Sequence, residues 1–178
     1  MPSFGDPDAR LLVVGLAPGV TGANRTGRPF TGDYAGNLLY DTLTAHGFAN
    51  GAFKARPDDG LELRDCIVTN AVRCVPPQNK PVGAEVNACR RFLCGRLAAT
   101  PRLRAVVTLG GIAHGSVVRA LGGRLADAPF GHGAEAELGG ARVFASYHCS
   151  RYNTNTGRLT PAMFDAVFAR VRDFLDAA

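Results

Sequence analysis

The sequence from Leu11 to Asp33, LLVVGLAPGVTGANRTGRPFTGD, joins a short apolar run to a long loop that is rich in glycine and proline. Residues 11–16 are apolar and partly β-branched, which predicts a buried strand. The loop runs from Ala17 to Gly32 and ends at Asp33, where a helical pattern begins. A strand that leads through such a loop into a helix presents backbone N–H groups and the positive end of the helix to a ligand. The stretch therefore predicts a site for a ligand that carries phosphate.

The loop matches neither of the standard glycine patterns for phosphate binding. It carries instead two arginines, Arg25 and Arg28, one aromatic ring, Phe30, and one carboxylate, Asp33. Guanidinium groups bind phosphate bidentately, an aromatic ring can stack on a base, and a carboxylate can hold or activate water. This combination favours an enzyme that acts on nucleic acid. In the alternative interpretation, the glycines of the loop only shape a surface turn.

The length of 178 residues allows one domain with a core of its own, so we expect a single domain over residues 1–178. The formal net charge of +5 and the pI of about 9.2 are compatible with a nucleic-acid partner but do not require one. No apolar run approaches the roughly 20 residues that a membrane helix needs, and residues 1–10 lack the pattern of a signal peptide. We therefore expect a cytoplasmic protein without a membrane partner.

Apolar runs and helical patterns alternate along the whole chain. Strands are predicted at residues 11–16, 66–72, 105–109 and 142–147. Helices are predicted at residues 34–46, 82–99, 112–121 and from Thr160 onward. This alternation predicts a three-layer α/β/α sandwich with a central, mainly parallel sheet of about four strands. Residues 1–10 are expected to form an extended lead-in, and residues 124–141 have no assigned element.

The predicted helix at residues 82–99 has apolar residues at a helical spacing. Its expected buried face consists of Val82, Val86, Cys89, Leu93 and Leu97. Three arginines lie off that face in this assignment: Arg90, Arg91 and Arg96. We interpret them as a solvated surface rather than a specific phosphate site.

Chemically useful side chains follow three of the predicted strands. Phe30 and Asp33 follow the first strand, Asn70 lies near the end of the second, and His148 follows the fourth. Ligands of sheets of this kind bind beyond the carboxyl ends of the strands. We therefore expect these four side chains to converge on one site.

Three segments together resemble the uracil-DNA glycosylase superfamily, and within it the family 5 (type B) enzymes. They are GLAPGVTGANRTGRPFTGD after the first strand, VRCVPPQNKP after the second and YHCSRYNTNTGRLT after the fourth. The similarity runs from about Phe4 to the C-terminus. It implies a uracil-DNA glycosylase-like fold and an enzyme that hydrolyses the N-glycosidic bond of uracil, and often of other deaminated bases, in DNA to initiate base excision repair. Enzymes of this kind flip the target nucleotide out of the stack.

The resemblance implies roles for individual residues. His148 would donate a hydrogen bond to uracil O2 and stabilise the departing anion, and Asp33 would position water and favour the sugar cation. Phe30 would stack on the flipped base, and Asn70 would contact its Watson–Crick edge. Ala17, Gly19 and Gly22 would let the backbone approach the ligand. The alternatives are a core histidine, a helix N-cap for Asp33 and a core aromatic for Phe30.

Residues on both sides of the expected pocket would contact the DNA backbone or fill the gap left by the flipped base. They are Asn24, Arg25, Ser150, Arg151, Asn153, Thr156 and Arg158. The family usually has proline where this chain has Cys149. This difference calls the rigidity of the loop beside His148 into question.

The five cysteines are an odd number, which argues against a disulfide framework. Type B enzymes typically hold an iron–sulfur cluster of the 4Fe-4S type, and two of its ligands correspond to Cys74 and Cys89. The other two come from an N-terminal Cys-x-x-Cys segment that this sequence does not contain. Either the N-terminus is truncated or the protein has lost the cluster. We expect no cluster in the chain as given, and one in a full-length form that supplies the missing pair.

Two alternative functions remain open at this stage. A hydrolase for nucleotides or sugar phosphates could use the same loops and would bind free nucleotides. A non-catalytic protein that binds damaged DNA would bind DNA without releasing a base. The glycosylase interpretation predicts a monomer that binds uracil-containing DNA with a steep dependence on salt.

Overall fold

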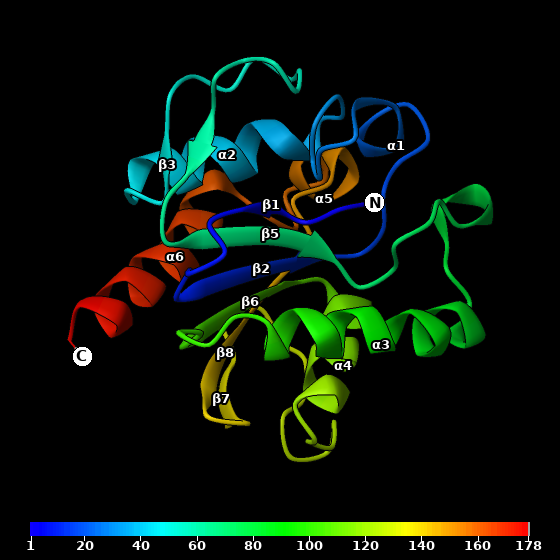
Figure 1. The fold of residues 1–178 in the computed structure, drawn as a ribbon, viewed down its shortest axis with the longest axis vertical. Helices are drawn as coiled ribbons and strands as arrows, with labels where there is room; N and C mark the ends of the chain where they lie inside the picture. Colours follow the sequence, from blue (N-terminus) through cyan, green and yellow to red (C-terminus); the bar gives the residue numbers. More distant parts are fainter. Residues whose placement is uncertain (178) are drawn as a thin grey trace.

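A computed structural model describes residues 1–177 (Figure 1). Within these residues the main sheet has six strands in the order β1-β5-β2-β6-β8-β7. Their bounds are β1 (Phe4–Gly5), β2 (Leu11–Gly15), β5 (Cys66–Asn70), β6 (Ala105–Leu109), β7 (Glu135–Leu138) and β8 (Ala141–Ser146). The four central strands are parallel, and β1 and β7 are antiparallel edge strands. The mainly parallel sheet is thus confirmed, and its four parallel strands are the four that the sequence predicts.

Helices cover both faces of this sheet, as the predicted sandwich requires. The helices are α1 (Ala23–Thr26), α2 (Ala35–Ala45), α3 (Gly83–Ala98), α4 (Gly111–Ala120), α5 (Arg151–Asn155) and α6 (Pro161–Asp176), and a 3-10 turn spans Pro77–Asn79. In Figure 1, α2 and α6 lie on one side of the sheet and α3 and α4 on the other. A small second sheet pairs β3 (Ala49–Asn50) with β4 (Glu62–Leu63).

Strand β2 is apolar on both of its faces because both are covered. Leu11 and Val13 belong to the cluster that contains the apolar side chains of α2 and α6. Leu12 and Val14 belong to the cluster on the opposite face, with residues of α3 and α4. The continuous apolar run that predicts this strand is therefore explained by burial on two sides.

Helix α3 differs from its predicted amphipathic pattern. Of the expected apolar positions only Val86 and Leu93 are buried, and Val82 is 61% exposed. Arg90 and Arg96 are half-buried, whereas Arg91 is exposed. The expectation that all three arginines form a solvated surface is therefore wrong for two of them. Arg90 is spaced by four residues from Val86 and by three from Leu93, which places it on the inward side of the helix.

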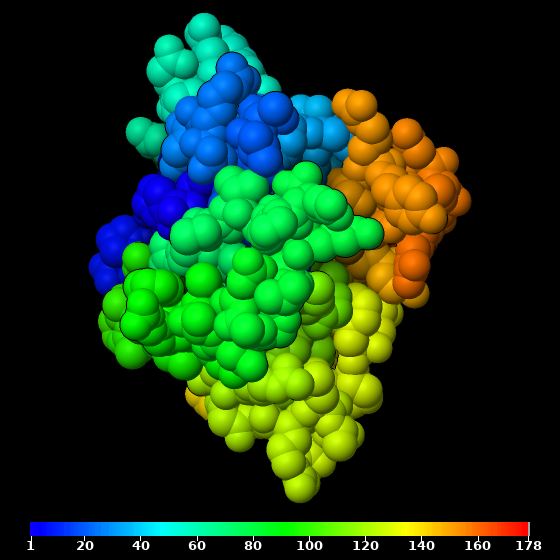
Figure 2. Space-filling view, turned by 90° about the vertical axis from the view of Figure 1, so that its right-hand side faces the viewer, coloured from blue at the N-terminus to red at the C-terminus, as the bar shows by residue number. Residues whose placement is uncertain are grey.

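The register of the sheet brings the loops of the expected site together. Gly15 pairs with Asn70 across β2 and β5, and Leu109 pairs with Ser146 across β6 and β8. The carboxyl ends of these parallel strands consequently meet at one edge. Figure 2 shows that edge face-on, with the loop after β2 in blue, the segment after β5 in green and the segment around α5 in orange.

No helix in residues 1–177 is long and apolar enough to cross a membrane.

Candidate active site

A small cavity lies at the carboxyl ends of the central strands. Its volume is about 40 Å³, and its lining residues are Ala17, Ala23, Phe30, Asp33, Ala35, Asn70 and His148. The structure thus brings together the residues that the sequence placed after three different strands, and adds Ala23 and Ala35. Ligand pockets measure roughly 300–1,000 Å³, so a base can enter only if the side chains around this cavity move.

Gly15 packs against two of the side chains that line the cavity, a role that the sequence interpretation missed. A Cβ atom on Gly15 would lie 2.4 Å from Cζ of Phe30 and 2.5 Å from Oδ1 of Asn70. Both distances are too short for non-bonded atoms, so the close packing of these two side chains requires glycine here. The signal in the sequence was the glycine that ends the first apolar run.

Asn70 is buried, and its side-chain oxygen has no partner. Oδ1 makes no hydrogen bond to any of the described residues, and the whole residue is 4% exposed. An unpaired buried carbonyl oxygen costs on the order of 1–3 kcal/mol. A ligand that donates a hydrogen bond to this oxygen would remove that cost.

Phe30 is both a core aromatic and a wall of the site. It belongs to the cluster under α2 and α6, and its ring is stacked on that of His148 at a centroid distance of 5.8 Å and an angle of 27°. Its φ of 53° is uncommon for a residue with a side chain. Gly36 permits this conformation, because a Cβ there would lie 1.8 Å from the carbonyl oxygen of Phe30.

Asp33 is half-buried next to the start of α2. Burial raises the pKa of its carboxyl group above the ordinary value, and the backbone N–H groups of Gly36 and Ala35 act in the opposite direction. Oδ1 is buried and has no hydrogen-bond partner in residues 1–177. The N-cap position of α2 falls on Tyr34, whose side chain caps nothing, whereas the Asp33 carboxyl interacts with the first N–H groups of the helix, so a capping role for Asp33 stays compatible with a catalytic one.

Gly22, in the long loop, makes room for the Asp33 carboxylate. A Cβ on Gly22 would lie 2.6 Å from Oδ2 of Asp33, and one on Gly19 would lie 3.6 Å from the same atom. Gly22 therefore does more than shape a surface turn, whereas a Cβ on Gly19 would make an ordinary van der Waals contact. Asp33 itself lines the cavity.

His148 is half-buried, and its ring packs against Phe30. Burial lowers the pKa of its imidazole to about 4, so the ring is neutral at pH 7. The ring makes no hydrogen bond within the described part of the chain, so its polar atoms are available to a ligand. The backbone carbonyl of His148 accepts a hydrogen bond of 2.8 Å from Nδ2 of Asn153.

Cys149 connects the His148 loop to helix α2. The residue is buried, and its thiol lies 3.5 Å from the carbonyl oxygen of Ala35, to which it donates. Burial raises the pKa of this thiol to about 12. A side-chain contact therefore fixes the loop at the position where the family usually has proline.

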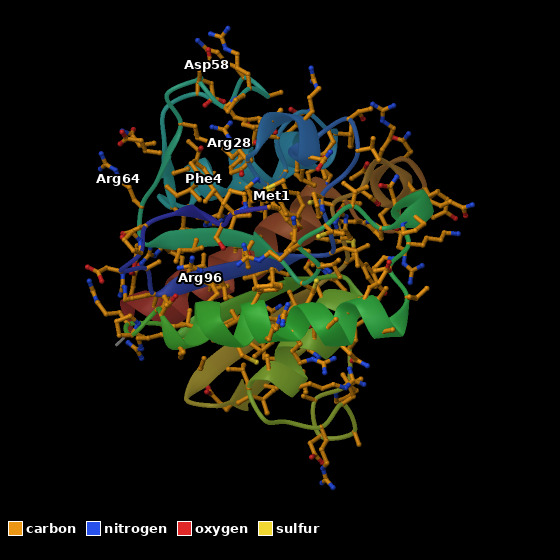
Figure 3. All side chains as sticks on the ribbon, turned by 45° about the vertical axis from the view of Figure 1, so that its right-hand side comes forward. Met1, Phe4, Arg28, Asp58, Arg64 and Arg96 are labelled. Atoms are coloured by element: carbon orange, nitrogen blue, oxygen red, sulfur yellow. The ribbon has the colours of Figure 1, made fainter. Side chains whose placement is uncertain are left out.

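Arg28 is unavailable for phosphate, in contrast to the expectation from the loop sequence. Its Nη1 and Nη2 donate to the two carboxylate oxygens of Asp59 at 2.8 Å each, and its Nε donates to Thr31. Figure 3 labels Arg28 near Phe4, and the guanidinium lies 5.0 Å from the centre of that ring. Asp59 comes from a polar loop that sequence reasoning left without a role.

The predicted DNA-contacting residues fall into two groups. Ser150 and Asn153 are used inside the chain, because Oγ of Ser150 accepts from the backbone N–H of Asn153 and thereby caps α5. The remaining five are exposed: Asn24, Arg25, Arg151, Thr156 and Arg158. Arg151 lies over the ring of Tyr34 and Arg158 over that of Tyr147. Tyr152, which is 71% exposed on α5, is a further surface aromatic that sequence reasoning missed.

Cys74 and Cys89 line one cavity of about 200 Å³ between the segment after β5 and helix α3. Their proximity agrees with a shared ligand. Among residues 1–177, however, no group of three or more histidine, cysteine, aspartate or glutamate side chains could hold a metal ion. The described residues alone therefore do not fit a cluster that needs four cysteines.

Comparison with known proteins identifies the family of this chain. Residues 2–172 match the model of the uracil DNA glycosylase superfamily. The chain is 48% identical over 165 residues to a type-5 uracil-DNA glycosylase of Thermus thermophilus, covering 92% of this chain and 75% of that protein. It is 45% identical over 170 residues to one of Pyrobaculum aerophilum, covering 96% and 74%. A type-5 uracil-DNA glycosylase of Mycobacterium bovis is 42% identical over 175 residues, which is 97% of this chain and 65% of that protein.

These matches confirm the resemblance that the three segments indicated. The fold, with its parallel sheet between two helical layers, agrees with them. The chain belongs to the uracil-DNA glycosylase superfamily.

Proposed function

We propose that this chain is a monofunctional DNA glycosylase that hydrolyses the N-glycosidic bond of uracil in DNA and so initiates base excision repair. The observation that carries the proposal is the meeting of Asp33, His148, Phe30 and Asn70 around one cavity in a member of this superfamily. The similarity to named type-5 uracil-DNA glycosylases over more than nine tenths of the chain supports the same activity.

In this proposal, Asn70 and Phe30 recognise the base. The buried Oδ1 of Asn70 has no partner among the described residues, and it can accept a hydrogen bond from N3–H of uracil. The amide nitrogen of the same side chain can donate to O4. The ring of Phe30 lies against the imidazole of His148, so a flipped base that stacks on Phe30 must first displace this contact.

Leaving-group stabilisation falls to His148. As the glycosidic bond breaks, negative charge develops on the uracil ring. A neutral imidazole has one N–H donor, and that donor can stabilise the charge on O2. Because burial lowers the pKa of His148 to about 4, the ring keeps the neutral form over the physiological pH range.

Water activation falls to Asp33. Its carboxylate can orient a water molecule toward the sugar and favour the cationic character that the sugar develops. The raised pKa of Asp33 makes the ionised carboxylate a stronger base than an ordinary aspartate. The carboxylate must be ionised to act in this way, so activity should increase with pH as Asp33 loses its proton.

In this proposal, exposed polar and cationic side chains around the cavity contact the DNA backbone. Arg25 lies in α1, Arg151 begins α5, and Arg158 follows α5, and all three are exposed. Exposed arginines bind phosphate with an affinity that decreases steeply with salt. The monomeric state and the cytoplasmic location stay predictions.

Cys74 and Cys89 are proposed as two of the four ligands of an iron–sulfur cluster in any form that supplies two more cysteines. Their common cavity supports this assignment. Base recognition, leaving-group stabilisation and water activation, as proposed here, do not depend on the cluster.

The test is base release from a labelled oligonucleotide that contains one uracil, followed by alkaline cleavage of the abasic site. We expect cleavage at the uracil and no hydrolysis of free nucleotides or sugar phosphates. Hydrolysis of free nucleotides without base release would instead support the nucleotide hydrolase. DNA binding without base release would support the damage-binding protein.

A further inference from the structure

A second cavity lies between helices α3 and α4. Its volume is about 470 Å³. The residues that matter for its chemistry are Asn87 and Arg90 of α3, and Ile112, Gly115 and Arg119 of α4. Of the described residues that line it, none is acidic. We call this cavity the α3/α4 cleft.

Arg90 lies on the inward side of α3, between two buried apolar residues of the same helix. Its Nη2 donates to Oδ1 of Asn87 at 2.7 Å. Its Nε is buried and has no hydrogen-bond partner in residues 1–177. A half-buried guanidinium without a carboxylate partner is costly, and an anion bound at its terminal N–H groups would offset that cost.

Arg119 supplies the second positive charge, from the other wall of the cleft. Its Nη1 donates to the carbonyl oxygen of Gly115 at 3.0 Å. A Cβ on residue 115 would lie 3.0 Å from the same Nη1, so glycine leaves room for this side chain. Neither Arg90 nor Arg119 forms an ion pair with a carboxylate of the described chain. The cleft therefore presents two guanidinium groups without a carboxylate partner, the half-buried one of Arg90 and the exposed one of Arg119, and this favours an anionic ligand.

The cleft adjoins the candidate active site. Helix α4 begins directly after β6, and a Cβ on Gly110 would lie 3.6 Å from the Cβ of His148. Figure 2 shows α3 in green and the α4 region in yellow-green on the same face as the loops of the site. Ile112, near the start of α4, is 44% exposed. A long polyanion that enters the active site can therefore continue into the cleft.

We infer that the α3/α4 cleft binds the sugar–phosphate backbone of the DNA that flanks the target nucleotide, through Arg90 and Arg119. This inference rests on the proposed function, because that function brings DNA to the neighbouring site. Phosphate oxygens would accept from the terminal Nη groups of Arg90 and from the guanidinium of Arg119. The exposed side chain of Ile112 would lie against a sugar.

The inference is tested with Arg90→Ala, Arg119→Ala and the double variant. Binding is measured by fluorescence anisotropy over a range of salt concentrations, with uracil-containing duplexes of one and of three helical turns. The matched control is Arg64→Ala, which removes one exposed positive charge near β4 and the amino end of β5 (Figure 3). Thermal unfolding of every variant shows whether the fold is retained.

We expect each cleft variant to bind the long duplex several-fold more weakly than the wild type, with the salt slope lowered by about 0.9 for each lost phosphate contact. The short duplex should lose less affinity, so the preference for the long duplex should fall in the variants and stay unchanged in Arg64→Ala. Equal losses for both lengths, or the same effect in Arg64→Ala, would overturn the inference.

Phosphate oxygens are also present in small phosphate compounds, which are the other kind of ligand to test. If inorganic phosphate binds at a site that Arg90→Ala abolishes, while long-duplex binding is unchanged, the cleft is an anion site that does not serve DNA. If the wild type releases no uracil but the length preference still depends on Arg90 and Arg119, the proposed function fails and the cleft inference stands.

Discussion

Arg28 and Asp59 form a buried, bidentate ion pair that fixes the loop carrying Phe30 and Asp33. Two N–H groups of Arg28 donate to the two oxygens of Asp59 at 2.8 Å, and the side chains are 5% and 0% exposed. The backbone N–H groups of Lys54 and Leu61 complete the contacts of the carboxylate. The pair joins residues separated by 31 positions in the chain. Its position identifies Arg28 as a structural residue of the site rather than a phosphate ligand.

Replacing Asp59 by asparagine should strongly destabilise the protein. The change leaves the buried charge of Arg28 without a partner, which costs about 3–5 kcal/mol in the free energy of unfolding. The control is Asp58→Asn. The Asp58 side chain is 77% exposed and pairs only with Arg56, so its replacement should change the free energy of unfolding by less than about 0.5 kcal/mol. Urea unfolding measures the free energy of unfolding of both variants. Equal stability of the two variants would contradict a structural role for the pair.

The same ion pair should make stability depend on acid pH. Arg28 and the backbone donors hold the pKa of Asp59 well below its usual range in the folded protein. A carboxylate with a lowered pKa contributes stability that is present above its unfolded pKa of about 3.9 and is lost as pH falls through the folded value. We therefore expect the free energy of unfolding to fall below about pH 4 in the wild type, and to fall less steeply in Asp59→Asn. If the free energy of unfolding fell equally steeply with pH in both proteins, Asp59 would not be the source of the sensitivity to acid.

Gly15→Ala should block the site while leaving the sheet in place. The new methyl group would meet the ring of Phe30 and the amide of Asn70 at distances below 3 Å, so one of them must move. We expect uracil release to fall by at least about tenfold, since misplacement by about 1 Å can cost a factor of 100. Gly95→Ala in helix α3 is the control, because a Cβ there meets nothing within 4 Å. Full activity of Gly15→Ala would show that Phe30 and Asn70 can accommodate a methyl group at this position.

The cysteines should differ in their reactivity toward a thiol reagent. Cys74 and Cys94 are exposed, whereas Cys66 and Cys149 are buried and their pKa values are raised by burial. Because the thiolate is the reactive form, the exposed pair should react in the native protein and the buried pair only after unfolding. Mass spectrometry of the labelled peptides identifies the sites. Labelling of Cys149 in the native protein would contradict its packing against Ala35.

The fold was largely predictable because the parallel strands carry apolar runs and the helices carry periodic ones. The two edge strands were not predicted. β1 has only two residues, and β7 has the sequence EAEL, in which polar residues alternate with apolar ones at an exposed edge. The inward position of Arg90 was missed because a charged residue on a helix normally marks the solvated face.

The site was predictable as a set of loop residues but not as a geometry. Asn70 and His148 could be chosen because they lie at or just beyond the carboxyl end of a strand, and Phe30 and Asp33 because they close the long loop that follows β2. Gly15 stood out only as the glycine that ends the first apolar run, since its packing against Phe30 and Asn70 depends on side chains of two other segments. The pairing of Arg28 with Asp59 likewise depends on a contact distant in sequence, so Arg28 was wrongly grouped with the phosphate-binding arginines.

The most direct test of the account is the single-turnover rate of uracil release, measured against pH for the wild type and for Asp33→Asn. Burial raises the pKa of Asp33, and the ionised form is the active one, so the wild-type rate should rise with pH and then level off. Because burial lowers the pKa of His148 to about 4, titration of this residue should not change the rate of uracil release near neutral pH.

Asp33→Asn should be about 10²–10⁴-fold slower, with a rate that no longer follows the titration of this group. Its free energy of unfolding at pH 7 should equal or exceed that of the wild type, because a charge that burial disfavours has been removed. The account is thus supported by a slow, stably folded variant with a flat pH profile. An Asp33→Asn protein with the rate and pH dependence of the wild type would contradict the central claim that Asp33 activates water in this site.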